Sequence, residues 1–443
     1  MAALTPVEDY LAALLASLPT PTPITVRLDE AYGAVLAQDA TALLPVPPWT
    51  NSAMDGYAIN TDDLAGQQAP VILPVSQDIP AGAAPQPLAP GTAARIMTGA
   101  MMPAGANAVL QVELTDQLPG PHAAPTQVEL REIPVPGHNV RAAGEDVTPG
   151  ALVVRAGTTL GGRELSSLAS TGHGSVQVFP PVRVGIVSTG SELREPGSLL
   201  APGKIPESNS LLLAGMVREC GAHYAGLWRS EDTAASLAQA LQEAAAHSDL
   251  VITSGGVSAG AFDPLTMLAT QGDSGVDLTF SKLSMQPGKP QAYGQIRSEN
   301  RTVPLVALPG NPVSVLVSFT TLVRPAVRVL AGLEGPDGAP TASSSPSLSL
   351  PRTSHPAPAS PVSLPASAPA AIGWSCPPGR RQYVPVMLTS DGMVMPTHRL
   401  GSGSHLVASL PAAQALAVVP EHVEAVAPGD EVALIPISTP AQP

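Results

Sequence analysis

The sequence predicts a multidomain α/β protein in which a domain with a parallel sheet is joined to smaller, mostly β parts. Strands and helices alternate regularly after Pro181, whereas residues 65–135 hold short strand-like runs without a full-length amphipathic helix. A segment rich in Pro, Ser and Ala then separates the alternating part from a β-rich C-terminus. Because 443 residues exceed one ordinary core, we expect two to four domains.

The first element is an amphipathic helix. Thr5 is expected as its N-cap, Pro6 as its first helical residue and Glu8 as the partner in a capping box. Acidic residues ahead of a short apolar stretch are not typical of a secretory signal. Residues 162–172 predict a second short helix that ends at Gly172. Since both helices are too short to stand alone, we expect them to pack together.

The alternating part contains buried strands and helices of ordinary length. Strands are expected at 182–188, 223–228, 249–254 and 302–308, with helices at 209–221 and 233–247, after Asp263, and from Asn311 to about Leu330. This alternation predicts a parallel sheet with helices on both faces.

The last part of the chain is β-rich. Of residues 340–371, 24 are Pro, Ser or Ala, so this segment cannot bury enough apolar surface to fold and is expected to be a linker or a disordered insert. Short strands separated by Asp-Gly and Pro-Gly turns follow it, and they predict a small β barrel or sandwich.

Composition limits the function classes. A net charge of −14 argues against general affinity for nucleic acid or anionic membranes, and we expect no apolar run of membrane-spanning length. Cys220 and Cys376 are too few for a disulfide framework, which favours a reducing cytoplasm. The only lysines are Lys204, Lys282 and Lys289, and all fall in one third of the chain.

Three glycine-containing loops follow three strands of the expected parallel sheet. They are STGSE (188–192, with Gly190), TSGGVSAGAFD (253–263, with Gly255, Gly256 and Ser258) and LPGNP (308–312, with Gly310 and Asn311). Because ligands bind at the carboxyl ends of such strands, where backbone N–H groups face an anion, the loops predict a phosphate-bearing ligand. Each loop alone could equally be a tight turn.

Carboxylates accompany these loops. Glu192, Asp232 and Asp263 lie beside them, and this arrangement predicts Mg²⁺, which takes one or two carboxylates together with water and phosphate oxygens. The alternative is that Asp232 and Asp263 only cap helices and that Glu192 is a solvated loop acid. Nothing indicates hydrolysis by a nucleophilic triad, and the chain has no H-E-x-x-H motif.

The stretch PPWTNSAMDGYAIN, residues 47–60, fits neither strand nor helix periodicity. Asp55 and Gly56 could form a tight turn, or they could belong to a specific site. Seven segments occur in the order and spacing of one family: SAMDGYAI (52–59), RIMTGAMMPAGANAV (95–109), VRAAGED (140–146), STGSEL, TSGGVSAGAFD, PGKP (287–290) and LPGNPVS. In these segments the chain resembles the molybdopterin molybdenumtransferase (MoeA) family, which is related to the C-terminal domain of gephyrin.

The resemblance is strong over residues 1–335 and weak beyond them. It implies an elongated N-terminal linker domain (1–48 and 141–180), a mostly β inserted domain (49–140) and a Rossmann-like molybdopterin-binding domain (181–335). A Pro/Ser/Ala-rich linker (336–371) and a C-terminal β domain (372–443) would follow. It further implies a cytoplasmic homodimer that converts adenylylated molybdopterin and molybdate to the molybdenum cofactor, with Mg²⁺ assisting and AMP released. The molybdopterin adenylyltransferase is a possible partner.

The resemblance also implies a cleft between two subunits. Catalytic roles fall on Asp55, Thr98, Asp146, Glu192, Asp263, Lys282 and Lys289, and the metal would bind Glu192, Asp232 and Asp263. Substrate-binding roles fall on Ser52, Arg141, Gly190, Asp232, Gly255, Gly256, Ser258, Pro290, Gly310, Asn311, Ser314, Arg380 and Ser404, with Tyr57 beside the Asp55 loop. The chain departs from the family at Gln286, Ser191 and Pro385, where many relatives carry lysine, aspartate and arginine.

Two other functions stay open at this stage. Residues 181–330 alone resemble the molybdopterin adenylyltransferase, although that enzyme lacks anything like SAMDGYA and ends its loop with a threonine-glycine pair where this chain has Val257 and Ser258. A non-catalytic, gephyrin-like scaffold is the third reading. Tungstate has nearly the size and charge of molybdate, so the residue types do not separate the two oxyanions.

Overall fold

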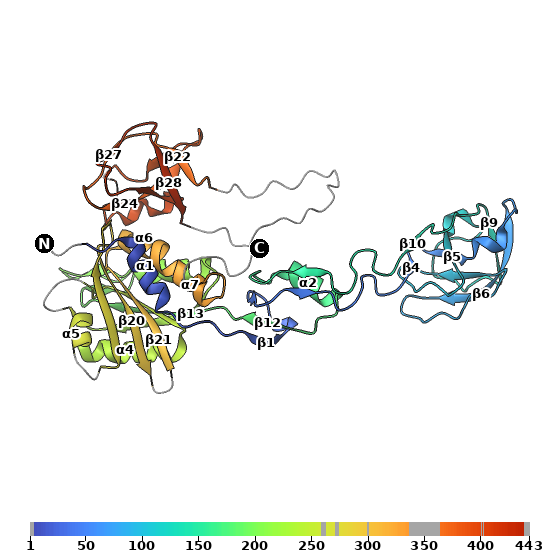
Figure 1. The fold of residues 1–443 in the computed structure, drawn as a ribbon, viewed down its shortest axis with the longest axis horizontal. Coiled ribbons are helices and arrows are strands. Elements are labelled where there is room, and N and C mark those ends of the chain that lie inside the picture. Colours follow the sequence, from blue (N-terminus) through green and yellow to red (C-terminus); the bar gives the residue numbers. More distant parts are fainter. Residues whose placement is uncertain are drawn as a thin grey trace.

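The computed structural model describes residues 4–257, 263–270, 274–298, 301–335, 364–399, 401 and 403–437. The protein is elongated, with a large mixed-sheet part and a C-terminal β part at one end (Figure 1). A small middle part carries α2, and a β-rich module lies at the far end (Figure 1). The chain enters the module through the middle part and returns through it, so the module is an insertion.

The far module is a five-stranded sheet in the order β8-β5-β7-β6-β9. Its strands are β5 (Gly56–Ile59), β6 (Val71–Ile79), β7 (Ala93–Ile96), β8 (Ala108–Gln111) and β9 (Gln127–Leu130), with short 3₁₀ turns at Thr61–Leu64 and Val112–Leu114. Both faces are covered, because Tyr57 and Ile59 of β5 enter one apolar cluster and Ala58 enters another. This agrees with the expectation of a mostly β module.

The middle part is built from short strands and one helix. Strands β1 (Ile24–Arg27), β12 (Ser175–Phe179) and β2 (Val35–Leu36) form an antiparallel sheet, and β3 (Ala40–Thr41) pairs with β11 (Leu152–Val154). Helix α2 (Gly162–Ser170) buries Leu168 against Leu36 and Leu160. Where the chain joins the far module, β4 (Asn51–Ser52) pairs with β10 (Val140–Arg141).

Helix α1 (Val7–Ala16) packs elsewhere than expected. Its residues Val7, Tyr10 and Leu14 lie in the core of the mixed-sheet part, whereas Leu168 of α2 lies in a separate cluster. The expectation that the two helices pack together is therefore wrong. The helix also begins after Pro6, without a side-chain cap, because Thr5 forms extended backbone hydrogen bonds with Lys282 and Ser284.

The large sheet is mixed, in the order β16-β13-β17-β21-β20-β18. The four strands β16 (His223–Ser230), β13 (Arg183–Thr189), β17 (Leu250–Ser254) and β21 (Arg301–Leu308) are parallel, as expected. The last two, β20 (Pro290–Ser298) and β18 (Val276–Lys282), run antiparallel to their neighbours. Ser298 pairs with Arg301, and so short a connection permits only an antiparallel pair. The expected parallel sheet is thus extended at this side by two antiparallel strands that were not predicted.

Helices cover both faces of this sheet. One face packs against α1, α3 (Asn209–Glu219) and the continuous helical run of α6 (Pro312–Ser318), a π-helical turn (Phe319–Val323) and α7 (Arg324–Leu330). The other face packs against α4 (Ala234–His247) and α5 (Pro264–Thr270). Ile186 points to the first face and Val187 to the second, as strand alternation requires.

The helical run Pro312–Leu330 is long and apolar enough to span a membrane by length and composition, with a mean hydropathy of 1.5. The expectation that no such run exists is therefore wrong. Of that window, 78% is buried inside the protein, so its apolar residues are accounted for by the core. No other helix of the described residues passes the same test.

The C-terminal part is a curved sheet in the order β19-β24-β26-β28-β22. It contains β22 (Ser367–Pro369), β24 (Arg381–Leu388), β25 (Val394–Pro396), β26 (Ala415–Val419) and β28 (Glu431–Pro436), with β23 (Trp374–Ser375) and β27 (Ala425–Val426) as a separate pair and a 3₁₀ turn at Val407–Ala412. It is a half-barrel whose two sides are linked through β25, because β25 pairs with β24 and Val394 of β25 forms an isolated bridge with Ala370, directly after β22. The expected small β barrel or sandwich is thus met in part.

Two strands of the C-terminal sheet lie outside its expected limits. Residues 336–363 of the expected linker fall outside the described residues, but β22 already belongs to the sheet before residue 372. Strand β19 (Met285–Gln286) comes from the connection between β18 and β20 and pairs in parallel with the start of β24. The C-terminal part is thus joined to the mixed-sheet part by backbone hydrogen bonds.

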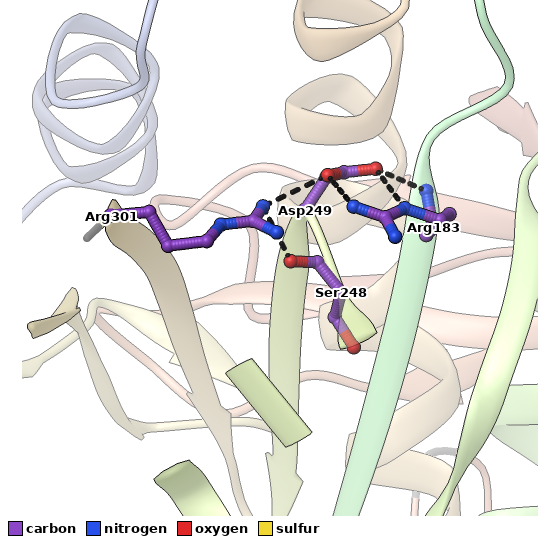
Figure 2. A network of polar contacts seen from close by, with 4 residues as sticks. All are labelled: Arg183, Ser248, Asp249 and Arg301. Atoms are coloured by element: carbon purple, nitrogen blue, oxygen red, sulfur yellow. Dashed lines mark hydrogen bonds and ion pairs between the residues drawn. The ribbon is translucent and has the colours of Figure 1, made fainter. Parts of the chain in front are cut away.

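A polar network ties together the first residues of three parallel strands. Arg183 begins β13, Arg301 begins β21 and Asp249 immediately precedes β17 (Figure 2). The Asp249 carboxylate accepts hydrogen bonds from the Arg183 backbone N–H and from both guanidinium groups at 2.8–3.0 Å, and Arg301 also donates to Ser248 O (Figure 2). Partial burial raises the pKa of Asp249, but these hydrogen bonds outweigh burial, so the pKa lies below its ordinary value.

We expect Asp249→Asn to lower the free energy of unfolding by about 1 kcal/mol at pH 7, a value discounted for solvent screening of half-exposed groups. A carboxylate with a depressed folded-state pKa stabilises the protein above its unfolded pKa. The difference between variant and wild type should therefore shrink as the pH falls below about 4. Calorimetric unfolding between pH 3 and 7 measures it. Asp277→Asn, which breaks the exposed pair with Arg297, is the matched control and should change little.

Candidate functional site

The three glycine loops meet at one side of the mixed sheet. They follow β13, β17 and β21, which are adjacent and parallel, so their carboxyl ends lie together. Gly255 N donates to Leu308 O at 3.0 Å, and a Cβ on Gly255 would lie only 3.0 Å from Thr189 O. Gly255 and Gly256 have φ of 92° and 78°, which favour glycine. The loops are therefore packed together with their backbones in contact.

The lysines belong to the same side. Strand β18 runs antiparallel to β20, and β20 antiparallel to β21, so β18 ends at the side where β21 ends. Lys282 is the last residue of β18 and pairs with Pro290, the first residue of β20. Lys289 O accepts a hydrogen bond from Leu283 N at 2.8 Å. Neither ammonium group has an ion-pair partner among the described residues.

Asp232 supports the first loop and does not cap a helix. Its carboxylate accepts hydrogen bonds from Ser191 N at 2.8 Å and from Thr189 Oγ1 at 3.4 Å. The cap of α4 is Thr233, whose side chain accepts from Ser236 N. The alternative reading of Asp232 as a helix cap is thus wrong, and its carboxylate holds the loop that carries Gly190.

The other two acids differ from Asp232. The Glu192 carboxylate lies over Gly190, because a Cβ on Gly190 would be 2.8 Å from Glu192 Oε2. Asp263 is buried and caps α5 by accepting from Leu265 N at 3.1 Å, as its alternative reading held. Within the described ranges, no three His, Cys, Asp or Glu side chains gather closely enough to hold a metal ion. Ser258 lies outside the described residues.

Asn209 is a residue of this region that sequence reasoning missed. It begins α3, is buried, and donates from Nδ2 to Ser254 Oγ at 2.9 Å and to Gly310 O at 2.7 Å. One amide therefore joins the second and third glycine loops. An Asn after a strand and before an apolar helix is the only sequence signal, and it equally indicates an ordinary helix start.

Residues 282–290, called the lysine loop because they include Lys282 and Lys289, are held by a buried polar side chain. Gln291 is 1% exposed and donates from Nε2 to Gly288 O at 2.7 Å and to Ser318 Oγ at 2.6 Å. Ser314, one helical turn before Ser318, is also buried. The side chain of Ser314 therefore lies inside the domain.

The C-terminal part contributes two contacts to this side. Asn311 Nδ2 donates to Ser404 Oγ at 3.1 Å, and Arg380 donates from Nη1 to Gln286 Oε1 at 3.3 Å. Gln286, where many relatives are expected to carry lysine, is thus the partner of Arg380. Pro385 lies within β24 opposite Leu416. Arg380 and Ser404 are therefore brought to the loops of the mixed sheet by the docking of the half-barrel.

The remaining predicted residues form a second group at the base of the far module. Asp55 lies in the turn between β4 and β5, and its Oδ1 accepts from Thr98 N at 2.6 Å and Thr98 Oγ1 at 2.7 Å. These two bonds, the backbone one first, lower the pKa of Asp55. Buried Ser52 holds the same turn, donating to Met54 O at 2.5 Å. Tyr57 is buried in the core of the module.

Arg141 and Asp146 lie near this turn on the returning chain. Arg141 pairs with Asn51 across β4 and β10, and Asp146 N donates to Val46 O at 2.9 Å. Both side chains are exposed. In one chain this group lies at the far module, well separated from the mixed sheet (Figure 1). A single protomer therefore does not bring the two groups of predicted residues together.

The Thr98 hydroxyl should tune the charge of Asp55. We expect Thr98→Val to raise the pKa of Asp55 while leaving it below the ordinary value, because the backbone N–H of residue 98 still donates. A carboxyl NMR titration measures this. Thr92→Val removes a hydroxyl that contacts no carboxylate and is the control. An unchanged Asp55 pKa in Thr98→Val would contradict the assignment.

Three cavities lie away from these residues. One of about 240 Å³ is lined by Leu18, Leu36 and Phe179, and another of about 350 Å³ by α1, α7 and β24. The third, of about 270 Å³, lies between α3 and Leu410. None of the three is lined by a predicted site residue.

Comparison with known families covers most of the chain. A model of the MoeA N-terminal region (domain I and II) matches residues 5–172, one of a probable molybdopterin binding domain matches 185–329, and one of the MoeA C-terminal region (domain IV) matches 367–437. Each of the three matched ranges includes predicted site residues.

Curated relatives and solved structures agree with these families. The chain is 44% identical over 322 residues to molybdopterin molybdenumtransferase 2 of Mycobacterium tuberculosis, covering 71% of this chain and 76% of the relative. It is 36% identical over 329 residues to the molybdopterin molybdenumtransferase of Haemophilus influenzae, covering 73% and 77%. The structure of a molybdopterin biosynthesis MoeA protein from Pyrococcus horikoshii matches at a TM-score of 0.73 and 28% identity, over 99% of this chain and 100% of that one.

Proposed function

The chain belongs to the molybdopterin molybdenumtransferase family, and from this membership we propose that it inserts molybdate into adenylylated molybdopterin with release of AMP. It is a transferase of molybdenum cofactor biosynthesis. One observation carries the proposal: the glycine loops and both lysines lie at the same side of the mixed sheet. Backbone N–H groups there suit phosphate, and ammonium groups suit a tetrahedral dianion.

The molybdate would be held by cations and hydroxyl groups. Lys282 and Lys289 have no carboxylate partner among the described residues, and the half-barrel adds Arg380 and Ser404. Donor groups of this kind bind an oxyanion better than carboxylates do. Gln286 already accepts from Arg380, which orients the guanidinium without adding charge. Tungstate would meet the same donors.

The residues present fit Mg²⁺ with two protein carboxylates. Mg²⁺ usually takes one or two carboxylates together with water and phosphate oxygens, so a cluster of three acids is not needed. Glu192 and Asp232 stand at the first glycine loop and would hold the ion, while Asp263 caps α5. The ion would act as a Lewis acid on the phosphoanhydride. In this proposal the glycine loops orient the adenylate, and Lys289 and Arg380 hold the incoming oxyanion.

The complete site would need a second chain. Asp55 lies between β4 and β5 and is bonded to Thr98, and Arg141 belongs to β10, with Asp146 on the returning chain. These strands lie at the far module, away from the mixed sheet of the same chain (Figure 1). A homodimer in which each far module faces the mixed sheet of its partner would complete two equal sites. We further propose a reducing, cytoplasmic setting, consistent with free Cys220 and Cys376.

Incubation of the purified protein with adenylylated molybdopterin, molybdate and Mg²⁺ tests the reaction. We expect AMP to appear in proportion to molybdenum cofactor formed, and chelation of Mg²⁺ to slow it. Retention of the adenylate under these conditions would contradict the proposal. A parallel incubation with ATP and molybdopterin tests the adenylyltransferase reading, and net formation of the adenylate would favour it.

A further inference from the structure

A cavity of about 350 Å³ lies at the junction of α1, the π-helical turn with α7, and the C-terminal sheet. Its apolar wall is formed by Val7, Leu11, Pro325 and Ile435. Its polar residues are Arg324, Arg328, Arg381, Glu8, Glu334, Thr320, Thr321 and Tyr383. This volume is at the small end of ligand sites, and the mixture of one apolar wall with a few charged groups is typical of them. None of these residues belongs to the proposed transferase site.

One of the three arginines of this cavity makes no ion pair with any described residue. Arg328 pairs with Glu334, and Arg381 pairs with Glu8 and Glu421. Arg324 has no carboxylate partner among the described residues, and its Nη1 donates only to the carbonyl oxygens of Pro436 and Ile437, at 2.8 and 3.0 Å. Burial is also the largest cause of a lowered pKa at Arg324. A half-buried guanidinium without a direct ion pair is costly, and a bound anion would offset that cost.

The backbone at this cavity is unusual. Phe319–Val323 forms a π-helical turn between α6 and α7, and Thr320 and Thr321 of that turn line the cavity. The threonine hydroxyls donate to Leu316 O and Val317 O, so they are acceptors toward the cavity and add no positive charge. Such π turns occur often at functional sites. Arg324 directly follows the turn and, among the described residues, is the arginine of this wall that makes no ion pair.

We propose that this cavity binds a small organic anion, with its carboxylate on Arg324 and its apolar body against Val7, Leu11, Pro325 and Ile435. The planar guanidinium matches a carboxylate in a two-bond geometry. The apolar wall selects an anion with a hydrocarbon body over an inorganic ion. The bound anion would contact α1, the helical run and the C-terminal sheet at the same time. It would therefore stabilise the packing of these three parts against one another.

Binding of benzoate to the full-length protein tests this proposal, with benzamide as its uncharged counterpart. Saturation-transfer NMR gives the affinities, and the rise of Tm with benzoate gives a second readout. We expect benzoate to bind at about 10 mM or tighter and benzamide at least about 10-fold more weakly. Equal binding of the two, or no benzoate binding at this concentration, would overturn the proposal.

Two variants test whether benzoate binds in this cavity. Arg324→Gln keeps an amide donor for the carbonyl groups and should weaken benzoate binding about 10-fold, while Leu11→Trp should fill the cavity and abolish binding without touching Arg324. Arg27→Gln, which alters an exposed pair with Asp29, is the control and should bind as wild type. The affinity of a variant is counted only if its far-UV circular dichroism spectrum matches that of the wild type. Wild-type affinity in either cavity variant, or an equal loss in Arg27→Gln, would refute the assignment. The readouts involve no cofactor synthesis, so they stand apart from the transferase test.

Discussion

Mixing two inactive variants should restore about a quarter of the wild-type activity. The first is Asp55→Asn, which alters the far module, and the second is Lys289→Ala, which alters the mixed-sheet side. Each alone should lose about 100-fold or more in the rate of AMP release, because in the proposed site each removes a charged group beside the reacting phosphate or oxyanion. In a shared-site dimer, half of the randomly mixed dimers are mixed pairs, and each mixed pair has one intact site out of two.

The separation of the two residue groups within one chain is the reason for this expectation (Figure 1). The variants are mixed after reversible dissociation or by co-expression, and AMP release is measured at fixed total protein. A site built within a single chain would leave the mixture as inactive as its components.

The matched control is a mixture of Asp55→Asn with Asp146→Asn, which alter the same half of the site. It should show no recovery, and recovery there would contradict the arrangement. A pure scaffold would show no activity to restore.

Gly56→Ala should destabilise the far module by about 3 kcal/mol or more. Strand β5 lies between β7 and β8, and a Cβ on Gly56 would be 2.1 Å from Leu110 O and 2.9 Å from Gln111 Cα. Both contacts are with backbone atoms of the neighbouring strand, so no side-chain rotation relieves them. The strands would have to separate, and the cores on both faces of β5 would loosen.

Calorimetry of the full chain measures this loss as a lower Tm for the transition of the far module. Gly162→Ala is the control, because nothing lies within 4 Å of a Cβ at that position, and we expect a change within about 0.5 kcal/mol. A wild-type Tm for Gly56→Ala would show that β8 can move away from β5 at little cost. The glycine of the SAMDGYA segment would then have to be explained by something other than strand packing.

The sequence predicted those elements whose signals are local. Hydrophobic runs marked β13, β17 and β21, and helix patterns marked α3, α4 and the run from Asn311, all within one or two residues of their observed limits. The glycine loops were placed from the same alternation. Such signals lie within about ten residues of chain, and the structure preserves them.

Long-range pairing was not predictable from those signals. The hairpin of β20 and β21 depends on a connection too short for a crossover, and the pattern of residues 290–308 also fits parallel strands. Helix α1 carries an apolar face, but only the folded chain reveals that this face meets the mixed sheet and not α2. Asn209 gains its role from Gly310, about 100 residues later in the chain, and a single sequence holds no record of that contact.

Strand β19 covers part of an exposed sheet edge and so limits self-association of the protein. The outer side of β24 would otherwise offer unpaired N–H and C=O groups to any passing strand, which is the usual route to sheet-to-sheet aggregation. Met285 and Gln286 cover one end of that side, and β25 covers the other. The lysine loop thus also protects the half-barrel against templated association with other chains.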